Sequence, residues 1–151
     1  MEKPVFGVKA CDKPRCKTCP NILPTDSYYF TEVNYTYHIK GVFDCTATDV
    51  LYVISCKNPN CSLYYIGKTV QLRNRMTQHR NCIPNPDFHK QKIYQHLASC
   101  GQGNFWVTPF YKMKRPGLLA HLTTEDYFIR KFKPSLNTMG TFSFDGHQLY
   151  Y

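Results

Sequence analysis

Residues 50–55 read Val-Leu-Tyr-Val-Ile-Ser, and residues 63–67 read Leu-Tyr-Tyr-Ile-Gly. Each run is short and almost wholly apolar, as expected of a strand that is buried on both faces. The Asn-Pro-Asn sequence at 58–60 is a turn signal between them. We therefore predict a hairpin with an enlarged loop, in which Tyr52 and Tyr65 lie side by side on one face.

The chain after this hairpin predicts helices and one further strand. Gly67 is expected to end the second strand. The later elements are, in chain order, a helix from a Thr69 cap to about Arg80, a helix over Phe88–Ser99, a strand over Phe105–Lys112, and a helix over Thr124–Phe132 capped by Thr123 and ending before Pro134. Together they predict an α/β (α+β) fold with a small, three-stranded, mainly antiparallel sheet flanked by helices.

The segment before the hairpin has a different character. Residues 1–48 are rich in Cys, Pro and Lys and show little periodicity, apart from a strand pair at Ser27–Phe30 and Tyr35–Lys40. We predict three parts: a Cys-rich, zinc-bound extension at 1–48, a core at 49–138, and an irregular tail at 139–151.

Composition and charge limit the functional classes. The 151 residues are 42% hydrophobic, which suits one globular domain, and no apolar run reaches the roughly 18 residues of a membrane-spanning helix. A net charge of +9 favours a polyanionic partner, nucleic acid before an acidic membrane surface. The first five residues lack a secretory signal, so we expect an intracellular location, and a nuclear one for a protein that acts on DNA.

The eight cysteines favour metal over disulfides in such a reducing compartment. Four thiolates suit Zn²⁺, and so do three thiolates with one imidazole. We predict one zinc site from Cys11, Cys16, Cys19 and Cys45, and a second from Cys56, Cys61, His96 and Cys100. The alternatives are ordinary buried thiols or a secreted chain with four disulfides.

A further set of side chains matches the needs of phosphodiester hydrolysis. Arg and Lys position a phosphate, a Glu oxygen binds a divalent metal, and Tyr or His takes a proton from water. Arg75 and His79 share a face of a predicted helix, and Glu125 lies in the first turn of the last one. Each of these residue types has an ordinary structural use, so the joint pattern carries the interpretation.

This joint pattern resembles the GIY-YIG nuclease family over residues 49–138. The motifs are Val50-Leu51-Tyr52, Tyr65-Ile66-Gly67, Arg75 and His79 at fixed distances, then Glu125 and Asn137. The stretch from Cys11 to Pro20, residues 39–45 and the strand ending at Cys56 look like the extended nuclease domain of Penelope-like retroelements. The first motif departs from the family in Val50 and Leu51.

The resemblance implies a role for each matching residue. Tyr52 is the candidate general base or water-orienting group, and Tyr65 belongs to the same hydrogen-bonded cluster. The other implied roles are a strand-to-helix turn at Gly67, phosphate contacts at Lys68 and Arg75, a place in the catalytic network for His79, binding of Mg²⁺ or Mn²⁺ by Glu125, and support of the site by Asn137. His89 is the nearest match to a further histidine or tyrosine of some members. Such domains are also expected to carry a zinc finger, whose usual last ligand is His where this chain has Cys100.

Basic residues gather next to the proposed site. Residues 68–92 hold six cations and one acidic residue, and among them Arg73 and Arg80 join Lys68 and Gly67 as expected DNA contacts. This charge supports DNA as the partner, and the resemblance to GIY-YIG nucleases implies a metal-dependent DNA endonuclease. The resemblance to Penelope-like domains further implies a role in mobile-element integration, with a reverse-transcriptase domain as a partner in the parent element. The alternative is a non-catalytic zinc-finger module that binds nucleic acid on a nuclease-derived fold.

Overall fold

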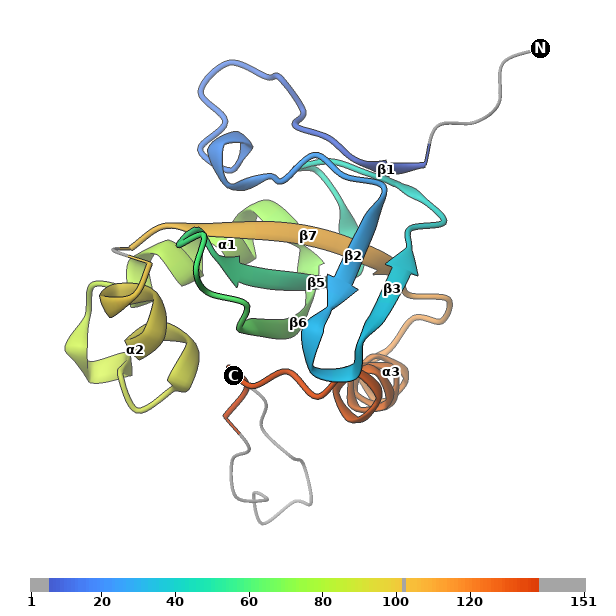
Figure 1. Cartoon of the computed structure of the whole chain (residues 1–151). Helices are drawn as coiled ribbons and strands as arrows, with labels where there is room; N and C mark the ends of the chain where they lie inside the picture. The colour runs from blue at the N-terminus through green and yellow to red at the C-terminus, as the bar shows by residue number, and fades with distance from the viewer. Residues whose placement is uncertain (1–5, 102, 139–151) are drawn as a thin grey trace.

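The fold is built around a three-stranded antiparallel sheet in the order β6-β5-β7 (Figure 1). The structure is a computed structural model that describes residues 6–101 and 103–138. The strands are β5 at Thr48–Cys56, β6 at Tyr64–Gln71 and β7 at Phe105–Lys112. The predicted fold class, the central strand and the third strand are confirmed.

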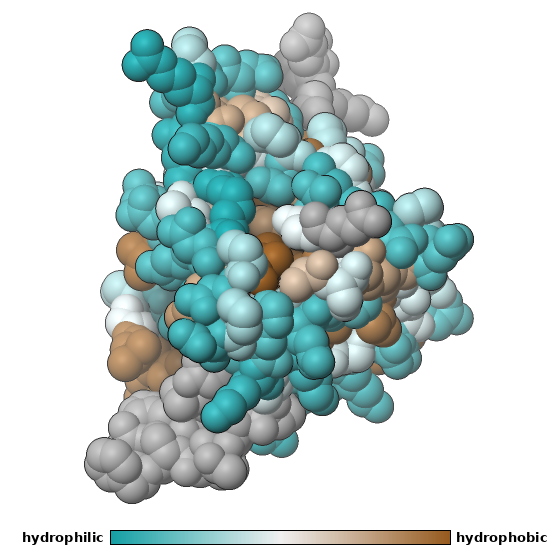
Figure 2. All heavy atoms as spheres, turned by 90° about the vertical axis from the view of Figure 1, so that its left-hand side faces the viewer, coloured by the Kyte–Doolittle hydropathy of each residue, from teal (hydrophilic) through white to brown (hydrophobic). Residues whose placement is uncertain are grey.

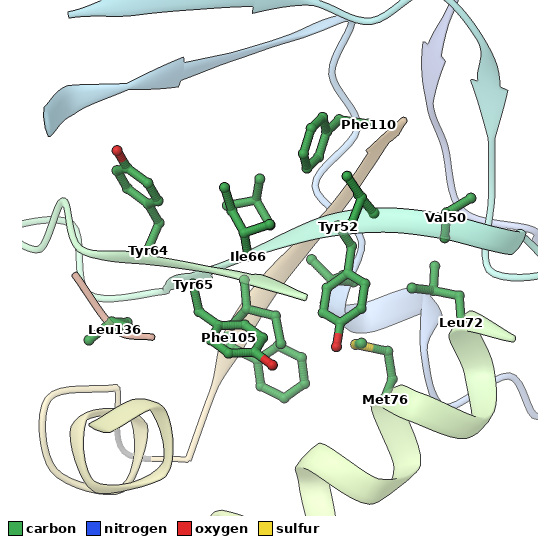
Figure 3. Packing of buried hydrophobic residues seen from close by; sticks show 14 of the residues in the cluster. Val50, Tyr52, Tyr64, Tyr65, Ile66, Leu72, Met76, Phe105, Phe110 and Leu136 are labelled. Atoms are coloured by element: carbon green, nitrogen blue, oxygen red, sulfur yellow. The ribbon is translucent and has the colours of Figure 1, made fainter. Parts of the chain in front are cut away.

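The β5–β6 pair is the predicted hairpin with its enlarged loop. Tyr52 lies opposite Gly67, and Ile54 lies opposite Tyr65, so the two phenols are diagonal neighbours on one face. Both rings point to the same side of the sheet, toward α1, whereas Tyr64 points to the other side (Figure 3). The hairpin thus aligns the two tyrosine motifs.

Strand β6 does not end at Gly67, as the sequence suggested, but continues to Gln71. Thr69 is not a helix cap. Its hydroxyl accepts from the Gln71 backbone N–H at 3.1 Å and donates to the Gln71 carbonyl at 2.9 Å. This local turn favours extended backbone over helix, so α1 begins three residues later and spans Leu72–Cys82.

The other two helices also start where the sequence did not place them. Helix α2 spans Lys92–Ser99, preceded by a 3₁₀ turn at Pro86–Phe88. Helix α3 spans Leu118–Phe132, so Thr123 lies inside it and its hydroxyl donates to the Leu119 carbonyl. Glu125 is therefore near the middle of α3, and the expectation of a first-turn carboxylate was wrong.

The N-terminal segment crosses one side of the sheet. It contains β1 at Gly7–Val8, a 3₁₀ turn at Cys19–Asn21, β2 at Ser27–Phe30, a 3₁₀ turn at Thr31–Val33, β3 at Tyr35–His38 and β4 at Val42–Phe43. Strands β2 and β3 form the predicted antiparallel pair, and β1 pairs with β4 in parallel.

This segment shares its hydrophobic core with the rest of the chain. The Phe30 ring stacks on Phe132 with centroids 3.8 Å apart, and meets Tyr64 edge to face. Val8, Ile22 and Phe43 belong to the same buried cluster. The predicted domain boundary at residue 48 stays a prediction, and apolar side chains from both sides of this boundary pack together. The predicted tail at 139–151 lies outside the described residues.

Candidate active site

A hydrogen-bonded chain of three buried side chains lies between the sheet and helices α1 and α2. The Tyr52 hydroxyl is 2.8 Å from Nε2 of His79, and Nδ1 of His79 is 2.9 Å from the Tyr94 hydroxyl. His79 and Tyr52 are fully buried. A neutral imidazole has one donor and one acceptor nitrogen, so one phenol donates to the ring and the other accepts from it. The chain therefore has a direction for proton transfer.

Burial keeps all of these groups neutral. It lowers the pKa of His79 well below its usual value, and the nearby charges of Arg75 and Arg80 lower it further. Burial also raises the pKa of Tyr52 well above the ordinary value, and that of Tyr65 to about 12. The phenols consequently act as neutral hydroxyls, able to pass a proton but not to stand as anions.

Gly67 makes room for the two phenols. A Cβ atom at this position would lie 2.5 Å from the Tyr52 oxygen and 2.8 Å from a Tyr65 ring carbon. Any side chain at this position would force the two phenols to move. The need for glycine at the second motif is therefore steric and comes from the close approach of the rings, since the strand continues through this residue.

Arg75 brings positive charge to this cluster from helix α1. Its guanidinium is half-buried, and Nη1 donates to Oε1 of Gln78 at 2.8 Å. Its charge opposes the effect of burial on both Tyr52 and Tyr65, lowering their pKa values. The predicted pairing of Arg75 and His79 on one side of a helix thus places a fixed cation beside the buried relay.

Glu125 supplies the carboxylate of the site from helix α3. Only 4% of the residue is exposed, and burial raises its pKa to about 7, although Lys68 and Arg75 pull it down. The Lys68 backbone also hydrogen-bonds to it. The charge of Glu125 in turn raises the pKa of Tyr65. The carboxylate, two cations and a phenol therefore meet at one place.

Asn137 attaches the chain after α3 to the second tyrosine motif. Its Nδ2 donates to the Ile66 carbonyl at 2.9 Å, and its Oδ1 accepts from the Ile66 N–H at 2.9 Å. Asn137 is 3% exposed, so both bonds are shielded from water. It holds the backbone next to Tyr65 and is a positioning residue in this structure.

Two predicted DNA contacts lie away from the tyrosines. Arg73 Nη2 is 3.1 Å from Sγ of Cys11, and Arg80 Nη1 donates to Oδ1 of Asn21 at 3.2 Å. Both project from the face of α1 opposite Arg75. His89 also takes no part in the site, because its Nε2 pairs with the Ile83 carbonyl.

Tyr94 is the residue of the site that the sequence analysis missed. It lies on α2 beside Ile93, and both are buried. The periodicity of α2 marks this side of the helix as apolar, but a tyrosine among twelve carries no signal of its own. Only the fold brings its hydroxyl to His79.

The first group of cysteines comes together as predicted. The sulfurs of Cys11, Cys16, Cys19 and Cys45 all lie within 4.8 Å of one another, and Cys19 is 3.6 Å from both Cys11 and Cys45. A tetrahedral zinc site with Zn–S bonds of about 2.3 Å has sulfurs about 3.8 Å apart, so the geometry fits. Burial raises the pKa of Cys16, but hydrogen bonds from the Thr18 and Cys19 backbone and from the Cys11 and Cys19 thiols together lower it to about 6, which favours the thiolate.

The second group also converges as predicted. Ligand atoms of Cys56, Cys61, His96 and Cys100 lie within 4.8 Å of one another, with Cys61 Sγ 3.1 Å from His96 Nε2. The group joins the hairpin loop to α2. All eight cysteines are free thiols in the structure, so it contains none of the disulfides of the secreted alternative.

Comparison with known proteins gives one match. The family model described as the GIY-YIG catalytic domain matches residues 49–139. No curated protein and no solved structure matches the chain significantly. The matched segment contains every residue of the tyrosine, histidine and carboxylate cluster described above.

Proposed function

The chain belongs to the GIY-YIG family, which implies a nuclease-type DNA endonuclease, and on this premise we propose that it hydrolyses DNA phosphodiester bonds with a divalent metal. One observation carries the proposal. Glu125 is a buried carboxylate whose pKa responds to both Lys68 and Arg75, and its charge acts on Tyr65, the neighbour of Tyr52 in the tyrosine cluster.

The residues around Glu125 fit Mg²⁺ or Mn²⁺. Mg²⁺ keeps several waters and is often held by one or two carboxylates together with phosphate oxygens of the substrate. In residues 6–101 and 103–138 the two groups of metal-binding side chains that converge are the cysteine clusters, so Glu125 offers a single ligand. Bound there, the metal would polarise the phosphate and lower the pKa of a water.

Lys68 and Arg75 would hold the scissile phosphate against Glu125. A guanidinium pairs with two phosphate oxygens at once, and an ammonium adds a point charge. Arg75 is already half-buried and fixed by Gln78 before substrate arrives. Charge that develops on the phosphate during attack therefore meets a preorganised cation, which is the largest usual contribution to such catalysis.

The buried relay would accept the proton of the attacking water. Because the Tyr52 phenol is neutral, its oxygen takes the water proton while its own hydroxyl proton passes to Nε2 of His79. Nδ1–H of His79 then donates to Tyr94. In this scheme Tyr52 is the water-orienting group, and His79 holds the proton only transiently, because burial keeps its pKa low.

A groove on the Lys68 side lies beside this site and would receive the substrate. The groove has a volume of about 480 Å³ and is lined by Lys68, Lys114, Arg115 and His121 among others. His121 precedes Glu125 by one helical turn, so the groove runs beside the carboxylate. Its cations suit a phosphate backbone.

The wider setting of the protein is part of the proposal. The resemblance of the Cys11–Pro20 stretch to Penelope-like retroelements supports a role in mobile-element integration, beside a reverse-transcriptase domain and in the nucleus. The two cysteine clusters support two structural Zn²⁺ ions, since each offers four protein ligands and no open position. In the part of the chain that the structure describes, no helix is long and apolar enough to cross a membrane.

A non-catalytic nucleic-acid-binding module is the second candidate. The burial of Tyr52, Tyr65 and Glu125 favours it, because little of the cluster is open to a substrate before something moves. This candidate predicts salt-sensitive DNA binding without turnover in Mg²⁺ or Mn²⁺.

The Glu125→Gln variant separates the two. Gln keeps the size of the side chain but removes the negative charge, and we expect loss of at least about 10³-fold in plasmid nicking with Mg²⁺, equivalent to about 4 kcal/mol of transition-state stabilisation. The control is Glu32→Gln, which changes an exposed carboxylate near Tyr64, on the other side of the sheet from Tyr52 and Tyr65, and should nick at the wild-type rate. Wild-type nicking by Glu125→Gln would exclude Glu125 as the metal ligand, and no nicking by the wild-type protein would favour the binding module.

A further inference from the structure

A second basic groove lies on the face of α1 that is turned away from the tyrosines. Its volume is about 370 Å³, and it runs between the Cys-rich loop and α1. Five of its lining residues are cationic, and none is acidic: Lys13, Arg15, Lys17, Arg73 and Arg80. The loop lies at the upper left in Figure 1, and the surface on that side is largely hydrophilic (Figure 2).

The floor of this groove is formed by two guanidiniums that are held in place. Arg80 donates to Asn21 at 3.2 Å and to Thr77 at 3.1 Å, and Arg73 contacts the sulfur of Cys11. Burial lowers the pKa of Arg80, because its guanidinium is partly removed from water at this position. Fixed, partly desolvated cations of this kind bind an anion with little loss of side-chain entropy.

No carboxylate of the described residues forms a salt bridge with these cations. Within residues 6–101 and 103–138 the one salt bridge joins Arg130 to Asp126, and neither residue lines the groove. Asp44 is close enough for Lys13 and Arg73 to lower its pKa, but its carboxylate accepts hydrogen bonds from Thr46. If zinc binds the four thiolates, that cluster carries a charge of about −2, which Arg73 partly offsets, leaving four cations for a ligand.

The backbone of the loop sets the direction of the exposed cations. Asp12 and Arg15 both have left-handed conformations, with φ of 58° and 65°. These two turns fold the chain between Cys11 and Cys16 into a compact bend that presents Lys13 and Arg15 at the rim of the groove. The bend is closed by the sulfur cluster, so the spacing of the cations is fixed.

We propose that this groove binds the phosphate backbone of the DNA substrate at a distance from the cut, an inference that rests on the proposed endonuclease function. Arg75 faces the active site, and Arg73 and Arg80 face the groove, so one helix separates the two. An α-helix with side chains is about 10 Å across, which corresponds to about three base steps of one strand at 3.4 Å each. The loop and the active site would then hold one duplex on both sides of α1.

The test compares two triple variants in full-length protein that also carries Glu125→Gln, so that cleavage does not interfere. The groove variant is Lys13→Ala, Arg15→Asn and Lys17→Ala, with Asn chosen because it tolerates a left-handed conformation. The matched control, Lys40→Ala, Lys131→Ala and Lys133→Asn, removes the same charge elsewhere and includes the left-handed residue 133. Affinity for a fluorescent 30-base-pair duplex is measured against salt concentration, after circular dichroism and zinc content are shown to be unchanged.

The groove variant should bind more weakly and lose about 2.7 units of slope in log affinity against log salt, about 0.9 for each phosphate contact, while the control loses less than one unit. Equal slopes for the two variants would overturn the proposal, as would a groove variant that loses binding to anionic lipid vesicles and keeps its affinity for DNA. If wild-type protein nicks plasmid while the slopes are equal, the groove proposal alone fails. If wild-type protein neither nicks nor binds DNA, the proposed function fails with it.

Discussion

The active site and the cysteine clusters fix their reactive groups in different ways. Tyr52 and His79 are fully buried and are held by hydrogen bonds and by packing between sheet and helix. Six of the eight cluster ligands keep part of their surface exposed and come from segments distant in the sequence, such as residues 11–19 and Cys45. The tyrosine–histidine cluster is held by the protein alone. Each cysteine cluster instead directs four ligand atoms toward one point, where a metal ion would complete it.

The difference indicates which parts of the molecule can stand alone. The strands that align the tyrosines bury their own apolar side chains, with Val50–Ile54 at 0% exposure. The Cys-rich loop has little regular structure between Val8 and Cys19, and few apolar groups to bury. Metal binding would therefore provide much of the folding free energy of the loop and little of that of the tyrosine cluster.

The largest effect should follow removal of zinc. Structural zinc contributes on the order of 10 kcal/mol of apparent binding energy per site at neutral pH, so chelation should unfold the loop at residues 9–21 first. Hydrogen exchange should show this region unprotected while β5 stays protected. Metal analysis should give two zinc ions per chain in the wild-type protein and one in the Cys45→Ser variant. The Cys82→Ser variant is the control and should keep both zinc ions, because Cys82 lies outside both clusters. If the zinc-free protein were as stable as the zinc-bound protein, the loop would not depend on metal for its folding.

A smaller effect should come from the charge of Glu125. Its pKa is raised from 4.5 to about 7. Between these two pH values the folded protein therefore keeps a proton that the unfolded chain has lost. Ionised Glu125 therefore lowers stability progressively as pH rises from about 4.5 to 7, by roughly 3 kcal/mol in total. Glu125→Gln should be more stable than wild type by about this amount at pH 8, and equal to it at pH 4. Urea unfolding at pH 8 and pH 4 measures the stability of both proteins. If Glu125→Gln were more stable than wild type by the same amount at the two pH values, the raised pKa of Glu125 would be contradicted.

Mg²⁺ provides a control for the same measurement. If Glu125 binds the metal, adding Mg²⁺ at pH 8 should stabilise wild type and leave Glu125→Gln unchanged, which narrows the difference between them. An equal response of both proteins would place the metal elsewhere.

The smallest effect on stability, with a large effect on activity, should come from Gly67→Ala. The new methyl group would meet the Tyr52 oxygen at 2.5 Å, so the phenols must shift, at a cost of about 1–3 kcal/mol. A displacement of about 1 Å in a positioned group lowers catalysis about 100-fold. Gly103→Ala is the matched control, because its φ of 84° makes the change costly while no atom lies within 4 Å. Plasmid nicking by Gly67→Ala at the rate of Gly103→Ala would show that the fit of the phenols is not critical.

The sequence predicted the elements that are defined by apolar pattern. β5 and β7 bury recurring apolar and aromatic side chains, and the hairpin follows from two apolar runs around a turn. The β2–β3 pair follows from its aromatic and β-branched residues, although only Phe30 of the pair is buried. The helix starts were less predictable, because Thr69 and Thr123 can cap a helix or hydrogen-bond locally, and in both cases the local bond prevailed.

The site was predictable where spacing along one element fixes the geometry. Arg75 and His79 share a helix, and Tyr52 and Tyr65 share a hairpin, so their proximity follows from local rules. The position of Tyr94 depends on how α2 packs against α1, which no local pattern records. The opposite faces of α1 likewise separated Arg73 and Arg80 from Arg75, although all three are basic residues of one helix.

The two hydrogen bonds of Asn137 also affect whether copies of the molecule associate with one another. β6 is an outer strand of the sheet, and an outer strand offers unpaired backbone groups to which a strand of another chain can add. The Asn137 amide occupies both groups of Ile66, and the Leu136 N–H occupies the Tyr64 carbonyl. The residues that hold Tyr65 in register thereby also shield this margin of the sheet from self-association, so one short segment protects both solubility and chemistry.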